Sequence, residues 1–132
     1  MLLRETDVMA DAVGDAATTV AELKDLVRRF VDERAWQPYH TPKNLAMGLA
    51  CEAAELMEHF LWVEGPKSHE LAQAPKTRAA IADELADVFA HLLNLSLATG
   101  IDLSGALQQK MVKNAVKYPA DQYRGKYTTD PG

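Results

Sequence analysis

The sequence predicts an all-α protein with a four-helix bundle-like arrangement, and three observations lead to this fold class. Apolar residues recur at helical spacing along most of the 132-residue chain. No run of alternating apolar and polar residues marks a strand, and no hairpin turn joins two strands. Caps and stops divide the chain into four main helical segments. We therefore expect one domain, large enough to bury a hydrophobic core.

The first two helices are predicted from the residues that begin them. Thr19 followed by Glu22 fits a capping box, which opens a helix over residues 20–34. The segment WQPYHTP interrupts the apolar spacing, and Thr41 before a proline is a good start for a second helix. Its apolar spacing continues to about Trp62. The polar segment EGPKSHELAQAPKT that follows is expected to be a connection, with room for a short turn of helix.

The last two main helices are bounded by glycine and proline. A third helix is expected to begin near Lys76 and to end before Gly100. Asp102 can cap a fourth helix over residues 103–117, which Pro119 terminates. The predicted organisation is a loosely ordered N-terminal arm at 1–18, a helical domain at 19–118 and an irregular tail at 119–132.

The third helix is apolar around nearly its whole circumference. A helix of that kind is buried on every side, and four helices of one chain would hardly cover it. We therefore predict a homo-oligomer, either a homodimer or a homotetramer. The residues that make the helix apolar include Ala79, Ala80, Ile81, Leu85, Val88, Phe89, Leu92 and Leu93.

Composition narrows the possible partners. The chain carries 14 basic and 19 acidic residues, a net charge of −5. A protein that binds the nucleic-acid backbone needs clustered Lys and Arg, so we expect no nucleic-acid partner. A nucleotide substrate stays possible, because a metal ion can supply the missing positive charge.

The sequence gives three further expectations about location and redox state. The N-terminus has no sustained apolar stretch of the signal-peptide kind. No later segment offers the roughly 18 uninterrupted apolar residues of a membrane span. We expect a cytoplasmic protein with no membrane partner. Cys51 is the only cysteine, so no intrachain disulfide is possible, and we expect it to be a small core residue.

Acidic residues repeat on the second and third helices. Glu52 and Glu55 are three residues apart and share one helix face. Glu84 and Asp87 repeat that spacing, and the same stripe continues through His91 and Asn94. Two such pairs can face each other if the helices pack antiparallel.

Four carboxylates brought together repel one another unless cations lie between them. Oxygen-only ligands suit Mg²⁺, or Mn²⁺ in its place, and no Cys or His pattern has zinc spacing. A di-iron bundle would need Glu three residues before His, which occurs at neither His59 nor His91. The alternative is a solvated acidic face, which is common for a single Glu-x-x-Glu. The residues alone leave both interpretations open.

Several segments resemble the all-α nucleoside triphosphate pyrophosphohydrolases, the MazG-like group, and especially the dCTP pyrophosphatase branch. The acidic pairs EAAE and ELAD are similar to the ExxE…ExxD signature of that group. The resemblance extends over residues 20–127. The segments that carry it are ERAWQPYHTPKNLAMGLACEAAELMEHFLW at 33–62, RAAIADELADVFAHLLNL at 78–95 and KMVKNAVKYP at 110–119.

The resemblance implies an activity and a fold. The activity is Mg²⁺-dependent hydrolysis between the α and β phosphates, with dCTP or a modified dCTP giving the monophosphate and pyrophosphate in nucleotide-pool cleansing. The fold is that of the all-α pyrophosphatases. Metal ions would neutralise phosphate charge and activate a bound water, and phosphoryl transfer requires no nucleophilic Ser or Cys.

The resemblance also assigns roles to residues. Metal ligands are expected at Glu52, Glu55, Glu84 and Asp87. Glu55, or failing that Glu52, would position or deprotonate the attacking water. Substrate contacts are expected at Trp36, His40, Asn44, Trp62, His91, Lys110, Asn114 and Tyr118. Related sequences often carry Tyr at the position of His91, which bears on base preference.

Two alternatives remain beside this reading. The enzyme could prefer another base, or the chain could be a non-catalytic module that uses the fold for oligomerisation or nucleotide sensing. The presence of all four acids favours catalysis over the second alternative. Either way, the expected small-molecule partner is a nucleoside triphosphate.

Overall fold

The computed structural model describes residues 14–126, and none of them lies in a β-strand. The all-α prediction is therefore confirmed. The chain divides into two compact units between Gly100 and Ile101. The domain boundaries expected at 18 and 118 stay a prediction, and most of the N-terminal arm lies outside the described residues.

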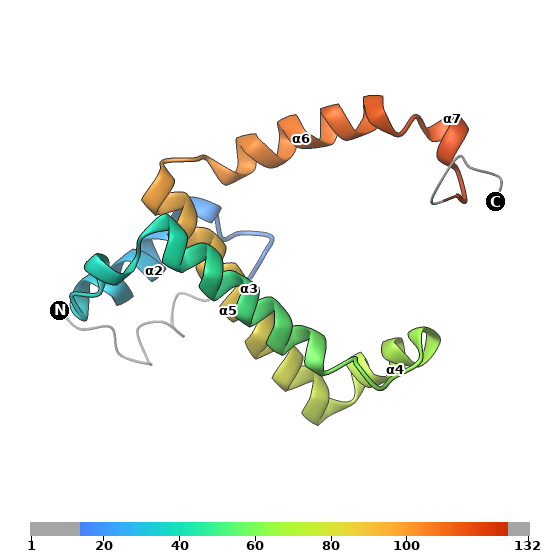
Figure 1. Cartoon of the computed structure of the whole chain (residues 1–132), viewed down its shortest axis with the longest axis horizontal. Helices are drawn as coiled ribbons and strands as arrows, with labels where there is room; N and C mark the ends of the chain where they lie inside the picture. Colours follow the sequence, from blue (N-terminus) through green and yellow to red (C-terminus); the bar gives the residue numbers. More distant parts are fainter. Residues whose placement is uncertain (1–13, 127–132) are drawn as a thin grey trace. The chain divides into compact units, whose positions relative to one another are not determined.

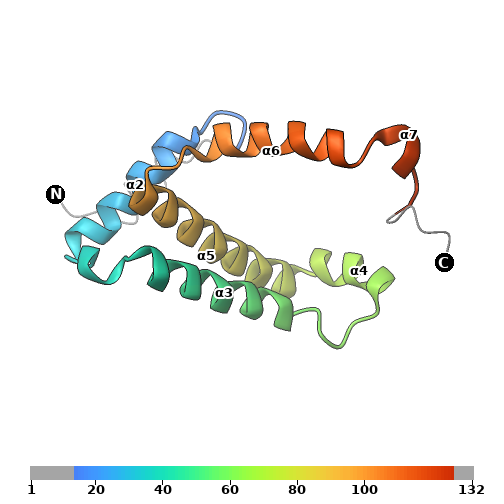
Figure 2. The ribbon, with the colours of Figure 1, turned by 45° about the horizontal axis from the view of Figure 1, so that its top comes forward.

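The first unit contains the helices that carry the predicted acids. In chain order its elements are α2 (Val20–Glu33), the 3₁₀-helix η1 (Gln37–Tyr39), α3 (Pro42–Glu58), the 3₁₀-helix η2 (Gly65–Lys67), α4 (Ser68–Gln73) and α5 (Pro75–Thr99). Helices α3 and α5 run antiparallel and side by side along most of their length (Figures 1 and 2). Helix α2 packs against the C-terminal part of α5, and α4 lies against its beginning.

The caps predicted from the sequence are present. Thr19 accepts a hydrogen bond from the backbone N–H of Glu22, whose carboxylate in turn accepts from the Thr19 backbone. Thr41 accepts from the backbone N–H of Asn44 at the start of α3. Helix α5 ends at Gly100, whose φ of 70° is the left-handed conformation that glycine adopts at low cost. These local signals set the helix starts and stops that align the acids.

Two helix boundaries differ from the prediction. Helix α3 ends at Glu58 rather than near Trp62, because turns occupy residues 59–62 ahead of the Gly65–Pro66 break. The polar connection forms α4, which is longer than the single turn allowed for. Apolar spacing alone did not reveal that the aromatic residues after Glu58 leave the helix.

The first unit has a small core. The buried apolar side chains are Val31 of α2, Leu45 of α3, and Ile81 and Leu93 of α5. Ser96 is the only buried polar residue among the described residues, with 2% of its surface exposed. The core therefore lies where α2 and α3 cover one side of α5, and it holds that side of α5 in place.

A single chain leaves part of α5 exposed, which agrees with the expectation that four helices would hardly cover it. Leu85 and Phe89 are 53% and 40% exposed, and Leu92 is 37% exposed. Cys51, expected in the core, is also exposed. On α3 it lies outside the stripe of less exposed residues that includes Leu45, Glu52 and Leu56.

The second unit consists of α6 (Leu103–Lys117) and α7 (Ala120–Tyr123). Asp102 caps α6 as predicted, accepting from the backbone N–H of Gly105 at 2.7 Å. Part of the tail expected to be irregular, Ala120–Tyr123, forms the short helix α7, which begins directly after Pro119. Residues 127–132 of that tail lie outside the described residues. The rings of Tyr118 and Tyr123 meet edge to face, 5.2 Å apart.

Within the part of the chain that the structure describes, no helix is both long and apolar enough to cross a membrane.

Candidate functional site

Three of the four predicted carboxylates meet between α3 and α5. Glu52 and Glu55 come from one face of α3, and Glu84 comes from the antiparallel α5. Each offers an oxygen within 4.8 Å of the others. We call these three side chains the acidic cluster. The i, i+3 spacing on α3 and the antiparallel packing of α5 are what bring them together.

Two oxygens of the acidic cluster are buried without a hydrogen-bond partner among the described residues. They are Glu52 Oε2 and Glu84 Oε2. A buried carboxylate oxygen without a donor is costly. Burial, followed by the charges of Glu55 and Asp87, raises the pKa of Glu52 above its ordinary value. A cation and its waters would supply the positive charge and the hydrogen-bond donors that these two oxygens lack.

The donor set fits a hard divalent cation. All three side chains of the acidic cluster are oxygen donors, and Mg²⁺ is held in proteins by a few carboxylates together with waters and phosphates. Asp87 is more exposed and lies outside the cluster. Its charge nonetheless acts on Glu52. The structure therefore brings three of the four expected ligands together and leaves Asp87 beside them.

His59 is a neighbour of the acidic cluster that the sequence did not single out. Its Nε2 lies 3.9 Å from Glu84 Oε1. His59 follows directly after the end of α3, where the chain turns back toward α4. This position was missed because the predicted second helix continued past His59. The residue was considered only as a possible di-iron ligand.

His91 lies one turn beyond Asp87 in a notch at Gly48 of α3. Its Nδ1 is 3.0 Å from the backbone oxygen of Asp87, so the ring donates there. A Cβ added at Gly48 would lie only 2.6 Å from His91 Nε2. The absence of a side chain at Gly48 therefore makes the space that the imidazole fills. This fixes the ring at the α3–α5 contact, close enough to Glu52 for the charges to interact.

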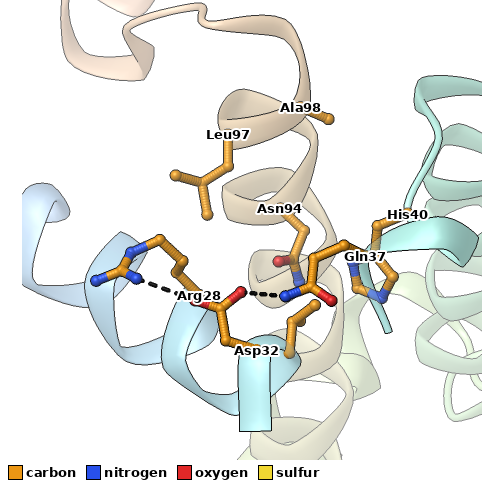
Figure 3. Close-up of a pocket in the computed structure, with 8 residues that line it drawn as sticks. Arg28, Asp32, Gln37, His40, Asn94, Leu97 and Ala98 are labelled. Carbon is orange, nitrogen blue, oxygen red and sulfur yellow. Dashed lines mark hydrogen bonds and ion pairs between the residues drawn. The ribbon is translucent and has the colours of Figure 1, made fainter. Parts of the chain in front are cut away.

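A pocket of about 190 Å³ opens where α2, η1 and α5 meet. Figure 3 shows the side chains that line it. Asp32 accepts hydrogen bonds from Arg28 at 3.0 Å and from the Gln37 amide at 2.6 Å. The residues that line the pocket are Arg28, Val31, Asp32, Gln37, His40, Asn94, Leu97 and Ala98. We call it the α2–α5 pocket.

The expected substrate contacts in the first unit are dispersed. His40 lines the α2–α5 pocket. The Asn44 amide donates to the backbone oxygen of Tyr39 and joins η1 to α3. Trp36 stacks edge to face on Phe30, with ring centroids 5.9 Å apart. Trp62 is 95% exposed.

The two tryptophans do not meet within one chain. Trp36 precedes α3 and Trp62 follows it, so the whole of α3, which has 17 residues and is about 25 Å long, lies between them along the chain. The Arg34 guanidinium lies 3.6 Å from the Phe30 ring centroid and 6.0 Å from that of Trp36. This arrangement holds Trp36 at the end of α2.

The expected contacts in the second unit lie on and after α6. The Asn114 amide is 3.9 Å from Met111 Sδ. Lys117 Nζ lies 5.1 Å from the Tyr118 ring centroid. Lys110 is exposed on the same helix. Since α6 lies beyond Gly100, these residues belong to a different compact unit from the acidic cluster.

The sequence and the fold both resemble known proteins. Residues 49–129 match the MazG-like family. The dCTP pyrophosphatase 1 of Rattus norvegicus is 37% identical over 116 residues, which are 86% of this chain and 68% of that protein. The Homo sapiens dCTP pyrophosphatase 1 is 35% identical over the same shares.

A solved structure shows the same fold. The crystal structure of a pyrophosphatase from Archaeoglobus fulgidus superposes with a TM-score of 0.73 at 37% sequence identity, covering 81% of this chain and 98% of that one. The match of residues 49–129 spans more than half of this chain, and it includes all three residues of the acidic cluster. This chain therefore belongs to the MazG-like family.

Proposed function

We propose that this protein is a metal-dependent nucleoside triphosphate pyrophosphohydrolase that converts dCTP, or a modified dCTP, to the monophosphate and pyrophosphate. Its role would be to remove unwanted nucleotides from the pool. The dCTP pyrophosphatases of Rattus norvegicus and Homo sapiens, similar over 86% of the chain, support this activity and substrate.

One observation of the structure carries the proposal. Glu52 Oε2 and Glu84 Oε2 are buried and face no donor among the described residues. A chain that served only as a scaffold would gain stability by replacing them with apolar residues. Their presence next to Glu55 is best explained by a cation that binds there during function.

The acids would share the task of binding the ion, and Glu55 would have a second role. Glu52, Glu55 and Glu84 would hold Mg²⁺, with Asp87 adding charge or a further ligand. The bound ion would neutralise the phosphates and lower the pKa of water. Glu55 would orient the water, or accept its proton, as the water oxygen bonds to the α-phosphorus. The bond from that phosphorus to the bridging oxygen breaks, and pyrophosphate leaves.

The remaining substrate contacts follow from side-chain chemistry. Lys110, Asn114 and Tyr118 could contact phosphate or ribose oxygens, since a cation, an amide and a phenol are common partners of such groups. Trp36 and Trp62 each offer a ring face on which a base could stack. Because about 25 Å of helix separates the tryptophans, only two chains together could place both on one base.

The chain is proposed to act as a homo-oligomer. Leu85, Phe89 and Leu92 follow one another at spacings of four and three residues, so they form an exposed apolar stripe on α5. A second copy covering this stripe would remove it from water. That copy could also supply the tryptophan that one chain cannot.

The experiment that tests the function is pyrophosphate release from each common nucleoside triphosphate, with Mg²⁺ and with EDTA. We expect release that requires Mg²⁺ and is fastest with dCTP. Glu55→Gln should lower kcat by at least a hundredfold while circular dichroism shows an unchanged helix content. Gln73→Glu on α4 is the control and should keep wild-type activity. A folded wild-type protein that releases no pyrophosphate would support the non-catalytic alternative.

A further inference from the structure

We propose that His59 is a positioning residue of the metal centre and holds the Glu84 carboxylate in the orientation that binds the ion. This role rests on the proposed function, because it adds a residue to the same site. His59 belongs neither to the two acidic pairs nor to the expected substrate contacts. Three observations support the role: the place of His59 in the fold, its distance from Glu84, and the surroundings of the two Glu84 oxygens.

The first observation is where the fold places His59. It is the residue directly after α3, and its φ of −60° and ψ of −23° are still helical. Glu52, Glu55 and His59 are therefore spaced by three and four residues on one helix face. The His59 side chain is 26% exposed, so it is mostly covered. The face of α3 that carries the acids thus ends in an imidazole.

The second observation is the distance to Glu84. His59 Nε2 lies 3.9 Å from Glu84 Oε1. Within residues 14–126, no other Lys, Arg or His nitrogen lies within 4.0 Å of a carboxylate oxygen of the acidic cluster. A direct hydrogen bond of about 2.9 Å requires the two groups to approach by about 1 Å. Rotation about the side-chain bonds of either residue provides that movement.

The third observation concerns the two oxygens of Glu84. Oε2 is buried and has no hydrogen-bond partner among the described residues, whereas Oε1 faces His59. A carboxylate that binds a metal ion needs an outer partner to orient it, and such partners contribute strongly to metal affinity. With Oε1 held by the imidazole, the flexible Glu84 side chain has less freedom to lose when Oε2 binds the ion.

His59 acts through Glu84 and is not itself a ligand. In the described part of the chain, the set of three mutually close ligand atoms consists of carboxylate oxygens alone and does not include a His59 nitrogen. The positioning role requires only an N–H at Nε2. Both the neutral imidazole and the imidazolium can supply that donor.

The test measures metal binding by the full-length protein, with Mn²⁺ as the probe and electron paramagnetic resonance of free Mn²⁺ as the readout. His59→Leu should raise the Kd for Mn²⁺ by about 10-fold to 100-fold. His59→Gln offers an amide N–H near the position of Nε2 and should bind within about threefold of the wild type. His69→Leu on α4 is the matched control, because it removes an exposed imidazole outside the acidic cluster. It should leave the Kd unchanged.

A second metal separates a positioning residue from a ligand. Co²⁺, measured by displacement of Mn²⁺, gains more than Mn²⁺ does from an imidazole ligand. Loss of an orienting group should therefore weaken both ions by the same factor, while circular dichroism in EDTA shows both His59 variants folded. A larger loss for Co²⁺, or no rescue by His59→Gln, would overturn the positioning role.

The wild type distinguishes this role from the proposed function. If the wild type binds Mn²⁺ and His59→Leu binds it equally well, the role of His59 is wrong and the metal centre stands. A folded wild type that binds neither Mn²⁺ nor Co²⁺ would refute the metal centre, and the role of His59 with it.

Discussion

Glu52 shows most directly how one side chain links stability to function. Its carboxylate is partly buried beside two other acids, and one of its oxygens has no donor within the described chain. Burial, then the charges of Glu55 and Asp87, raises its pKa. The charged form is therefore the one that the folded chain disfavours, and the residue costs stability when no cation is bound.

Glu52→Gln should raise the thermal stability of the metal-free protein. A raised carboxylate pKa means that the folded state binds its proton more tightly than the unfolded state does. The cost is therefore absent below the ordinary pKa of Glu, about 4.3, and grows as the pH rises through the raised value. The gain in Tm should appear in EDTA at neutral pH and shrink toward pH 4.

Added Mg²⁺ should reverse the order of the two proteins. The wild type should gain Tm with Mg²⁺ because the ion binds only the folded chain, while Glu52→Gln should gain much less. Equal Mg²⁺ shifts in both proteins would argue that the acidic cluster holds no ion.

Ala35 lowers the stability of the fold for a different reason, which is its backbone conformation. Its φ of 51° lies in the left-handed region, where any residue other than glycine is strained. It follows the end of α2 and precedes Trp36, so the strain sets the direction in which the chain leaves the helix. Ala35→Gly should stabilise the protein by about 1 kcal/mol in urea unfolding. A loss of stability would mean that the Ala35 methyl group makes contacts that outweigh the strain.

At the scale of the elements, the contact between α3 and α5 depends on Gly48. His91 fills the space that a side chain at this position would need, and its Nδ1 is held by the Asp87 backbone. The pair therefore sets how near the two acid-bearing helices can lie.

Gly48→Ala should destabilise the protein by about 1–3 kcal/mol, because the imidazole must leave its place. In a His91→Ala background the same substitution should stabilise by up to about 1 kcal/mol, since alanine is the better helix former. A double-mutant cycle in urea measures the difference. Additive effects of the two changes would show that the ring moves aside freely.

The helices could be predicted from the sequence where a local signal marks their ends. Thr19 with Glu22, Thr41, Asp102 and Gly100 each act through groups a few residues away, and the structure has all four as expected. The predicted end of α3 was wrong because no comparable signal follows Glu58 directly. The acidic pairs were visible for the same local reason, since i, i+3 spacing alone fixes a shared face.

The rest of the site depends on contacts between distant segments. Glu84 and His59 approach only because the chain turns back through α4. The α2–α5 pocket joins Asp32 and Gln37 to Asn94, some 60 residues further along the chain. Asn94 was visible as a polar residue on an apolar helix, but nothing in the sequence indicated which residues of α2 would face it.

At the scale of the whole molecule, the exposed apolar stripe of α5 predicts self-association. Phe89→Asp should convert an oligomer into smaller species in sedimentation velocity, because a charge at the centre of the stripe opposes burial against a second copy. Gln73→Asp on α4 is the control and should leave the sedimentation coefficient unchanged. A wild-type protein that sediments as a monomer at every concentration would contradict the oligomer.

Helix α5 combines an acid of the cluster, the edge of a pocket and an uncovered apolar stripe within its 25 residues. Nearly every turn of α5 contributes to one of these three features, so we expect most substitutions there to impair the protein. In a library covering every position, we expect the tolerated substitutions to be rarest on α5 and most frequent on α4. The slowest-changing segment over time should accordingly be this one helix, including positions that never touch a nucleotide.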